Sequence, residues 1–114
     1  MTEEKTFLCD LTDIMQRKSK GFSINSGNAM RHLFLVQQNG ELYGYINRCP
    51  HTGASLDWVP DQFLDITGKL IQCATHGAQF RIQDGLCVYG PCNGASLTPV
   101  PIKIEQDKVF LLHA

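Results

Sequence analysis

Two short stretches of sequence, Cys49-Pro50-His51-Thr52-Gly53-Ala54 and Cys73-Ala74-Thr75-His76-Gly77-Ala78, decide the fold of this chain. Each stretch supplies one thiol and one imidazole, followed by a glycine. Because twenty-one residues separate His51 from Cys73, the two stretches must be distinct loops that meet in space. We therefore expect one site, with the rest of the chain as its scaffold. The candidate metal-binding side chains are Cys49, His51, Cys73 and His76.

The composition is that of a single compact domain over residues 1–114. Hydrophobic residues make up 43% of the chain and charged residues 18%, which argues against disorder. A chain of this length buries roughly two thirds of its unfolded surface. The formal net charge is −1 with both signs interleaved, and no apolar run approaches the ~18 residues of a membrane span. We therefore expect neither nucleic acid nor membrane as a partner.

Cysteine usage indicates a reducing compartment. An odd number of thiols favours metal binding or simple packing over a disulfide framework. Residues 1–5 are polar and partly acidic, unlike a secretory signal or a transit peptide. We therefore expect a cytoplasmic protein in which Cys9 is a small buried residue. Cys87 and Cys92 could form a local disulfide, but a reducing compartment favours free thiols. The five cysteines are Cys9, Cys49, Cys73, Cys87 and Cys92.

The clearest local signal is a β-hairpin next to the first stretch. Residues 31–36 and 41–46 are rich in β-formers and flank Asn39-Gly40. This dipeptide is the strongest short-range hairpin signal, because both turn positions need a positive φ. The second strand leads directly to Cys49, so the hairpin places the first loop. His32 lies inside the first strand and is expected to be a packed or surface residue.

Alternating apolar residues and turn signals predict strands along the rest of the chain. Residues 65–72 read as a turn and a strand that ends at Cys73. Asp84-Gly85 predicts a third hairpin of the same design as Asn39-Gly40, and polar residues 16–21 read as a loop. No stretch shows a helical period with a cap, so no helix is expected. The other predicted strand segments are residues 6–11, 22–24, 79–82, 86–88, 100–104 and 108–112.

Two kinds of metal centre fit this donor set better than chance packing. A structural zinc ion accepts two thiolates and two imidazoles in a tetrahedron. Classical zinc sites, however, pair cysteine with cysteine and histidine with histidine, whereas each loop here mixes the two. A [2Fe–2S] cluster is elongated, so each loop can lie alongside it and offer a cysteine to one iron and a histidine to the other.

The pattern Cys-x-His, a gap, then Cys-x-x-His resembles the Rieske iron–sulfur proteins. The resemblance covers most of the chain, because Gly90-Pro91 followed by Leu97 and Pro99 is similar to the family's proline loop. It implies an all-β fold, a Rieske-like antiparallel β-sandwich with a small cluster-binding subdomain formed by two loops. That portion would cover approximately residues 47–92.

The resemblance also implies how one [2Fe–2S] cluster would be held. Cys49 and Cys73 would bind the inner iron. His51 and His76 would bind the outer iron, with their outer nitrogens near solvent. The glycines after each histidine would let backbone N–H groups approach the sulfides closely.

Departures from the family's pattern indicate a low reduction potential. High-potential respiratory members carry an extra cysteine in each loop, at the positions of Ala54 and Thr75 here. They also carry a serine and a tyrosine hydroxyl, at the positions of Ala78 and Phe80. Without these donors the reduced cluster is less stabilised. We therefore expect a potential near about −150 mV rather than about +300 mV, as in a ferredoxin-type member.

A cluster alone performs no bond chemistry, and the chain is too short for the second iron domain of the family's oxygenases. The preferred interpretation is a soluble one-electron carrier, not an enzyme. It would take electrons from a flavin reductase and pass them to a terminal oxygenase or a similar enzyme. Two alternatives stay open: a small electron-transfer subunit resembling that of nitrite reductase, and a zinc-stabilised Cys₂His₂ binding module.

Overall fold

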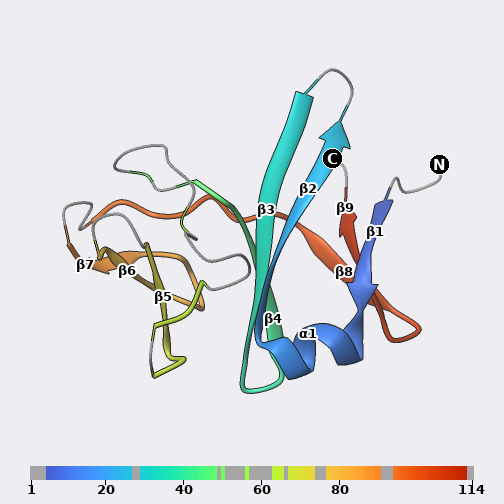
Figure 1. Ribbon diagram of the computed structural model, residues 1–114, viewed down its shortest axis with the longest axis horizontal. Coiled ribbons are helices and arrows are strands. Elements are labelled where there is room, and N and C mark those ends of the chain that lie inside the picture. The colour runs from blue at the N-terminus through green and yellow to red at the C-terminus, as the bar shows by residue number, and fades with distance from the viewer. Residues whose placement is uncertain are drawn as a thin grey trace.

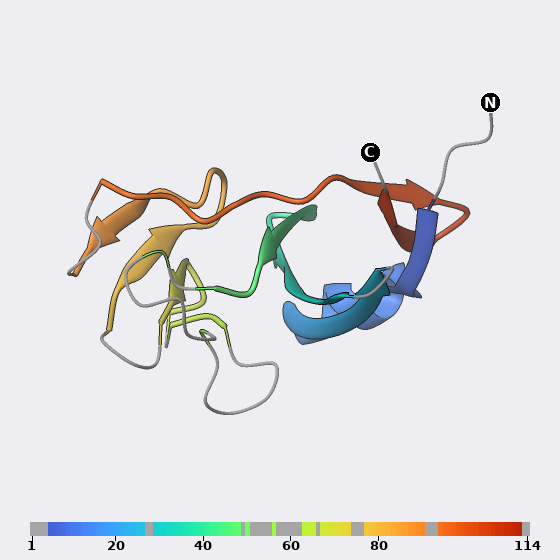
Figure 2. The same ribbon diagram turned by 90° about the horizontal axis from the view of Figure 1, so that it is seen from above.

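The computed structural model describes residues 5–26, 29–48, 50, 56, 63–65, 67–73, 77–90 and 94–112. Within these residues the chain forms nine strands and one short helix, and the strands make three antiparallel three-stranded sheets. The sheet β5–β7 lies at one end of the molecule and the sheet of β1, β8 and β9 at the other, with β2–β4 between them (Figures 1 and 2). The all-β prediction is confirmed.

The bounds of the elements follow the three sheets. The first sheet has the order β1 (Lys5–Asp10), β9 (Lys108–Leu112), β8 (Ile102–Glu105). The second has the order β2 (Ser19–Ser26), β3 (Ala29–Gln38), β4 (Glu41–Ile46). The third has the order β5 (Leu70–Gln72), β6 (Gln79–Arg81), β7 (Cys87–Tyr89). The edge strand predicted near residues 6–11 is therefore β1.

The first two sheets pack face to face and enclose an apolar core. One cluster in this core contains Cys9, Ile14, Leu35 and Val109, and a second contains Leu33, Val100 and Leu111. Each cluster draws side chains from both sheets, which is the packing of a β-sandwich. Cys9 is buried here, as predicted.

The helix α1 (Leu11–Arg17) corrects the prediction that the chain has none. Its seven residues bury only Ile14, and Asp10 makes no side-chain cap hydrogen bond. A helix this short leaves no periodic pattern in the sequence, because tertiary packing rather than propensity stabilises it. No helix in the described part of the chain has the length and apolarity to cross a bilayer.

The prediction of a loop over residues 16–21 is also wrong. Its first residues end α1, and Lys18 then adopts φ 70 and donates its backbone N–H to the carbonyl of Ile14. The strand β2 begins directly afterwards at Ser19. This polar stretch therefore contains the end of a helix and the start of a strand.

Two hairpins form where the sequence predicts them, and one of them has the predicted tight turn. Asn39 and Gly40 take φ 55 and 84 between the paired residues Gln38 and Glu41, which confirms the prediction. The third hairpin forms as predicted between β6 and β7, but its turn is longer than two residues. The Arg81 N–H donates to Leu86 O, and the Gly85 N–H donates to Arg81 O.

A third core joins the sandwich to the sheet β5–β7. The rings of Phe34, from β3, and Phe63 stack with centroids 4.3 Å apart. The hydroxyl of Tyr45, from β4, donates to the carbonyl of Ile82 at 2.6 Å. Buried residues of the sandwich and of the small sheet thus form one continuous apolar cluster. The position of β5–β7 relative to β4 is set by this cluster.

Gly44 in β4 offers a test of how tightly the sandwich is packed. A Cβ at Gly44 would lie 2.8 Å from Val100 Cγ2 and 3.2 Å from Leu35 Cδ2. Gly44→Ala should therefore lower the free energy of unfolding by about 1–3 kcal/mol, because overpacking shifts its neighbours. Val100→Ala removes the nearest methyl, so the double variant should lose less than the sum of the two single losses in urea unfolding. Additive losses would show that the two residues do not compete for space.

Candidate metal centre

Of the four predicted ligands, the described residues include Cys73. Cys49, His51 and His76 lie outside them, so their meeting in one site stays a prediction. Among the described residues, no three side chains of the metal-binding types form a group. The structure does show how the chain is held on both sides of each predicted ligand.

The first ligand segment, residues 47–56, is closed at its base by Asn47. The Asn47 N–H donates to His32 O at 2.9 Å, which extends the β3–β4 pairing past the end of β4. The Asn47 side-chain oxygen then accepts the Leu56 N–H at 2.8 Å. Leu56 is fully buried. The segment that carries Cys49 and His51 therefore has both ends fixed to the core.

The second ligand segment, residues 73–78, is closed by its own backbone. The Cys73 N–H donates to Ala78 O at 2.8 Å, and the Gly77 N–H donates to Cys73 O at 2.9 Å. Gly77 takes φ 70, a conformation that favours glycine. Cys73 and Ala78 are fully buried. The segment that carries His76 thus ends in two buried residues that are hydrogen-bonded to each other.

The turn before this segment is held by a carboxylate. Asp65 Oδ1 accepts the Thr67 hydroxyl at 2.7 Å and the backbone N–H groups of Lys69 and Leu70 at longer distances. Burial alone would raise the pKa of Asp65, but these hydrogen bonds outweigh it, and the pKa is lowered overall. The turn therefore keeps an ionised Asp65 at neutral pH and directs β5 toward Cys73, as the sequence predicted.

A third segment, residues 87–95, adjoins the second. The Cys87 N–H donates to Ala95 O at 2.8 Å, and the Gly94 N–H donates to Cys87 O at 3.3 Å. A Cβ at Gly90, which takes φ 102, would lie 2.8 Å from Ala78 Cα. Gly90, where the predicted proline loop begins, thus packs directly on the second ligand segment.

Some predictions about this third segment stay untested. Pro91 and Cys92 lie outside the described residues, so the expectation that Cys87 and Cys92 stay reduced remains a prediction. Cys87 itself is buried, and its thiol donates to Tyr89 O at 3.3 Å.

All three segments converge on one apolar core. Leu56, Cys73, Ala78 and Cys87 belong to the same buried cluster. A soft thiol in such surroundings fits a thiolate ligand of zinc or of an iron–sulfur cluster. The donor set of two thiols and two imidazoles fits both centres chemically, and its mixed order along the chain favours the cluster.

His32 and Cys9 lie away from the ligand segments, as predicted. His32 is exposed on β3, and its Nδ1 lies 2.8 Å from Ser23 Oγ. Cys9 lies in the core between the two larger sheets. Neither side chain contributes to the core under the ligand segments.

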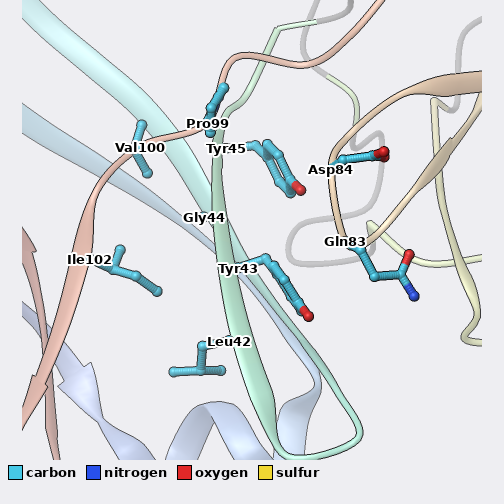
Figure 3. Close-up of a pocket in the computed structure, with 9 residues that line it drawn as sticks. All are labelled: Leu42, Tyr43, Gly44, Tyr45, Gln83, Asp84, Pro99, Val100 and Ile102. Carbon is cyan, nitrogen blue, oxygen red and sulfur yellow. The ribbon is translucent and has the colours of Figure 1, made fainter.

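A pocket of about 380 Å³ lies between β4, the turn at residues 83–84 and the segment 99–102. Figure 3 shows β4 with its tyrosines on one side of this pocket and the turn of Gln83 and Asp84 on the other. Cys73, the predicted ligand among the described residues, does not line it. The charged group at its rim, Asp84, is paired with Arg81. Hydrogen bonds from Arg81 and from the Leu86 N–H lower the pKa of this carboxyl.

Sequence reasoning missed two residues that hold the segments, Asn47 and Tyr45. The signal for Asn47 was present, because an asparagine directly after a strand often bonds backbone groups nearby. Tyr45 gave no signal, because its partner Ile82 is distant in sequence and the bond uses a backbone carbonyl.

Comparison with known proteins gives a family match. The family model described as the Rieske [2Fe-2S] domain matches residues 4–106. This range includes all four predicted ligands. The domain of this family holds a [2Fe–2S] cluster.

Curated relatives and solved structures agree with the fold. The chain is 28% identical over 111 residues to the ferredoxin component of the naphthalene 1,2-dioxygenase/salicylate 5-hydroxylase systems of Ralstonia sp, covering 97% of both proteins. It is 29% identical over 108 residues to human apoptosis-inducing factor 3, which uses 91% of this chain but only 16% of that protein. The structure of the Sphingomonas yanoikuyae B1 ferredoxin matches with a TM-score of 0.73 and 24% identity, over 97% of this chain and 100% of that ferredoxin.

The missing hydroxyl at Ala78 leads to a prediction about the reduction potential. A serine there would place a donor in the second ligand segment, and a hydrogen bond to a sulfur favours the reduced, more negative state. Ala78→Ser should raise the potential by on the order of 60 mV, which is a tenfold change in a one-electron equilibrium. A potentiometric titration followed by visible absorbance measures it.

The matched control is Ala95→Ser, because Ala95 packs against the same core from the end of the third segment. It should leave the potential unchanged. An equal rise in both variants would mean that added core polarity, rather than a hydroxyl in the ligand segment, causes the shift. No rise in Ala78→Ser would contradict the argument from the missing donor.

Proposed function

Because the chain belongs to the Rieske [2Fe-2S] family, we propose that it is a one-electron carrier whose cluster is bound by Cys49, His51, Cys73 and His76. The observation that carries this proposal is the convergence of the hydrogen-bonded segments on one apolar core. Cys73, whose thiol is buried in this core, makes two of those hydrogen bonds through its backbone. When bound, the cluster supplies one-electron redox chemistry.

The chain's own residues supply position and insulation. Cys49 and Cys73, whose side chain is buried, would bind the inner iron. His51 and His76 would bind the outer iron and face the redox partner. Phe80 and Ala78 are fully buried. They would keep water and hydroxyl donors away from the inner iron. This arrangement supports a potential at the low end of the Rieske range, as expected for a ferredoxin.

The partners that we propose are a flavin reductase as electron donor and a terminal oxygenase as acceptor. The chain spans nearly the whole length of a ferredoxin component from naphthalene dioxygenase systems, which supports a carrier of this kind. The odd number of cysteines supports a location in the cytoplasm, where thiols stay reduced. The chain itself performs no bond chemistry in this proposal.

A second candidate function is that of an electron-transfer unit within a larger reductase. The chain covers 16% of apoptosis-inducing factor 3, so similar sequences also occur as one part of longer proteins. A small subunit resembling that of nitrite reductase would be of this kind. It would use the same cluster and the same ligands, but its partner would be permanently bound.

The nature of the metal centre is tested by metal content. The protein purified without oxygen should contain about two irons and two acid-labile sulfides per chain, and dithionite should produce a rhombic EPR signal. One zinc per chain, with no colour and no sulfide, would instead establish the zinc-stabilised module.

The ligand assignment is tested by exchanging imidazole for thiol. His76→Cys should lower the potential by on the order of 100 mV, toward the about −400 mV of four-cysteine clusters, because an anionic ligand replaces a neutral one. His32→Cys is the control, because His32 is exposed on β3, away from the ligand segments, and it should leave the potential unchanged. If a His76→Cys variant with proven thiolate ligation kept the original potential, the assignment would be wrong.

The carrier function is tested by electron transfer in both directions. A flavin-containing ferredoxin reductase and NADH should bleach the protein's visible absorbance under anaerobic conditions. Addition of an oxidised terminal oxygenase from an aromatic-ring dioxygenase system should restore the colour at least tenfold faster than buffer does. If the protein instead purified from its source as a stoichiometric complex with a reductase, and did not exchange with free protein, the second candidate function would be favoured.

A further inference from the structure

Tyr45 joins the two parts of the molecule that carry the ligand segments. It lies on β4, the strand that leads into the first ligand segment. Its hydroxyl donates to the carbonyl of Ile82 at 2.6 Å, and Ile82 lies in the turn that follows β6, the strand after the second ligand segment. Both residues are buried. Figure 3 shows Tyr45 reaching from β4 toward the turn that contains Gln83 and Asp84.

The ring of Tyr45 is held on more than one side. A Cβ at Gly85 would lie 2.9 Å from Tyr45 Cε1 and 3.1 Å from Leu97 Cβ, so turn, ring and the 97–99 segment are in close contact. Tyr45 also forms an isolated β-bridge with Pro99. The ring therefore cannot move without displacing the β6–β7 turn.

The hydroxyl remains a donor over the working range of pH. Burial, with smaller contributions from Asp84 and Tyr43, raises the pKa of Tyr45 to about 12. The neutral phenol that donates to Ile82 is thus the form present at neutral pH. Loss of this donor would leave the Ile82 carbonyl buried without its partner, which is an unfavourable state for a backbone group.

Tyr43 provides an internal comparison on the same strand. Its hydroxyl donates to Oε2 of the exposed Glu41 at 2.8 Å. That bond joins two neighbouring residues of one strand and does not reach the β6–β7 turn. The two tyrosines thus differ in burial and in whether the hydroxyl connects β4 to the β6–β7 turn.

We propose that Tyr45 is a positioning residue for the cluster, which fixes the second ligand segment relative to the first. The inference rests on the proposed function, because it requires ligands from both segments on one cluster. Two irons at a fixed separation need donor atoms at a fixed separation. The Tyr45–Ile82 hydrogen bond connects the backbones that deliver those donors, and groups that orient ligands control metal retention.

The test compares Tyr45→Phe with Tyr43→Phe in the cluster-loaded protein. Tyr45→Phe should lose its cluster to an iron chelator about tenfold faster than the wild type, the lower end of the effect of removing an orienting group. Its reduced form should also give broader EPR lines, because the iron geometry varies more between molecules. Tyr43→Phe should match the wild type within about twofold in both measurements.

A stability control separates positioning from general loosening of the fold. Val109→Ala creates a cavity between the two larger sheets, away from the ligand segments, and lowers the thermal midpoint. If Val109→Ala lost its cluster as fast as Tyr45→Phe and broadened the EPR lines equally, the proposal would be overturned. Gly85→Ala, which displaces the Tyr45 ring but keeps its hydroxyl, should resemble Tyr45→Phe and serves if that variant does not fold.

Failure of this proposal is distinguishable from failure of the proposed function. A wild-type protein without iron and sulfide would end the proposed function, and Tyr45 would then have no cluster to position. A wild type and both phenylalanine variants with equally retained clusters and equal EPR lines would overturn only the role of Tyr45.

Discussion

Ligands from two separate loops can share one cofactor only if the backbone at the base of each loop is held in place. In this protein, hydrogen bonds close each base: Leu56 to Asn47 in the first segment, and Cys73 to Ala78 in the second. Leu56, Cys73 and Ala78 lie in one apolar core, which shields the second closure from competing water. Hydrogen bonds within the protein thus fix the backbone at the base of each segment.

The larger sandwich serves the site by giving this core something rigid to pack on. Phe34, from the middle strand of the second sheet, stacks on Phe63, which lies between the two ligand segments in sequence. Phe63 O also accepts the N–H of Gln72, the last residue of β5. The contact between Phe34 and Phe63 therefore links the sandwich to β5, the strand that directly precedes Cys73. This explains why a small cofactor site needs a domain of more than a hundred residues.

Much of the fold was predictable because its signals are local. Asn39-Gly40 takes the positive φ angles of a tight hairpin turn, and the strands on both sides follow from it. The turn at Asp84-Gly85 was predicted at the right place but with the wrong length, because its geometry depends on packing against Tyr45 and Leu97. The helix α1 was missed for a similar reason: burial of Ile14 against the sandwich stabilises a segment without helical periodicity.

The sequence by itself determined the chemistry of the site, because residue types and their spacing decide which metals can bind. Two cysteines and two histidines in mixed pairs already indicated an iron–sulfur cluster, and the residues Ala78 and Phe80 already indicated a low potential. Only the tertiary structure decided how the segments are fixed to one another. The hydrogen bond from Tyr45 to Ile82 joins residues far apart in the chain. Such a contact leaves no local pattern, because any buried carbonyl at that place would accept it.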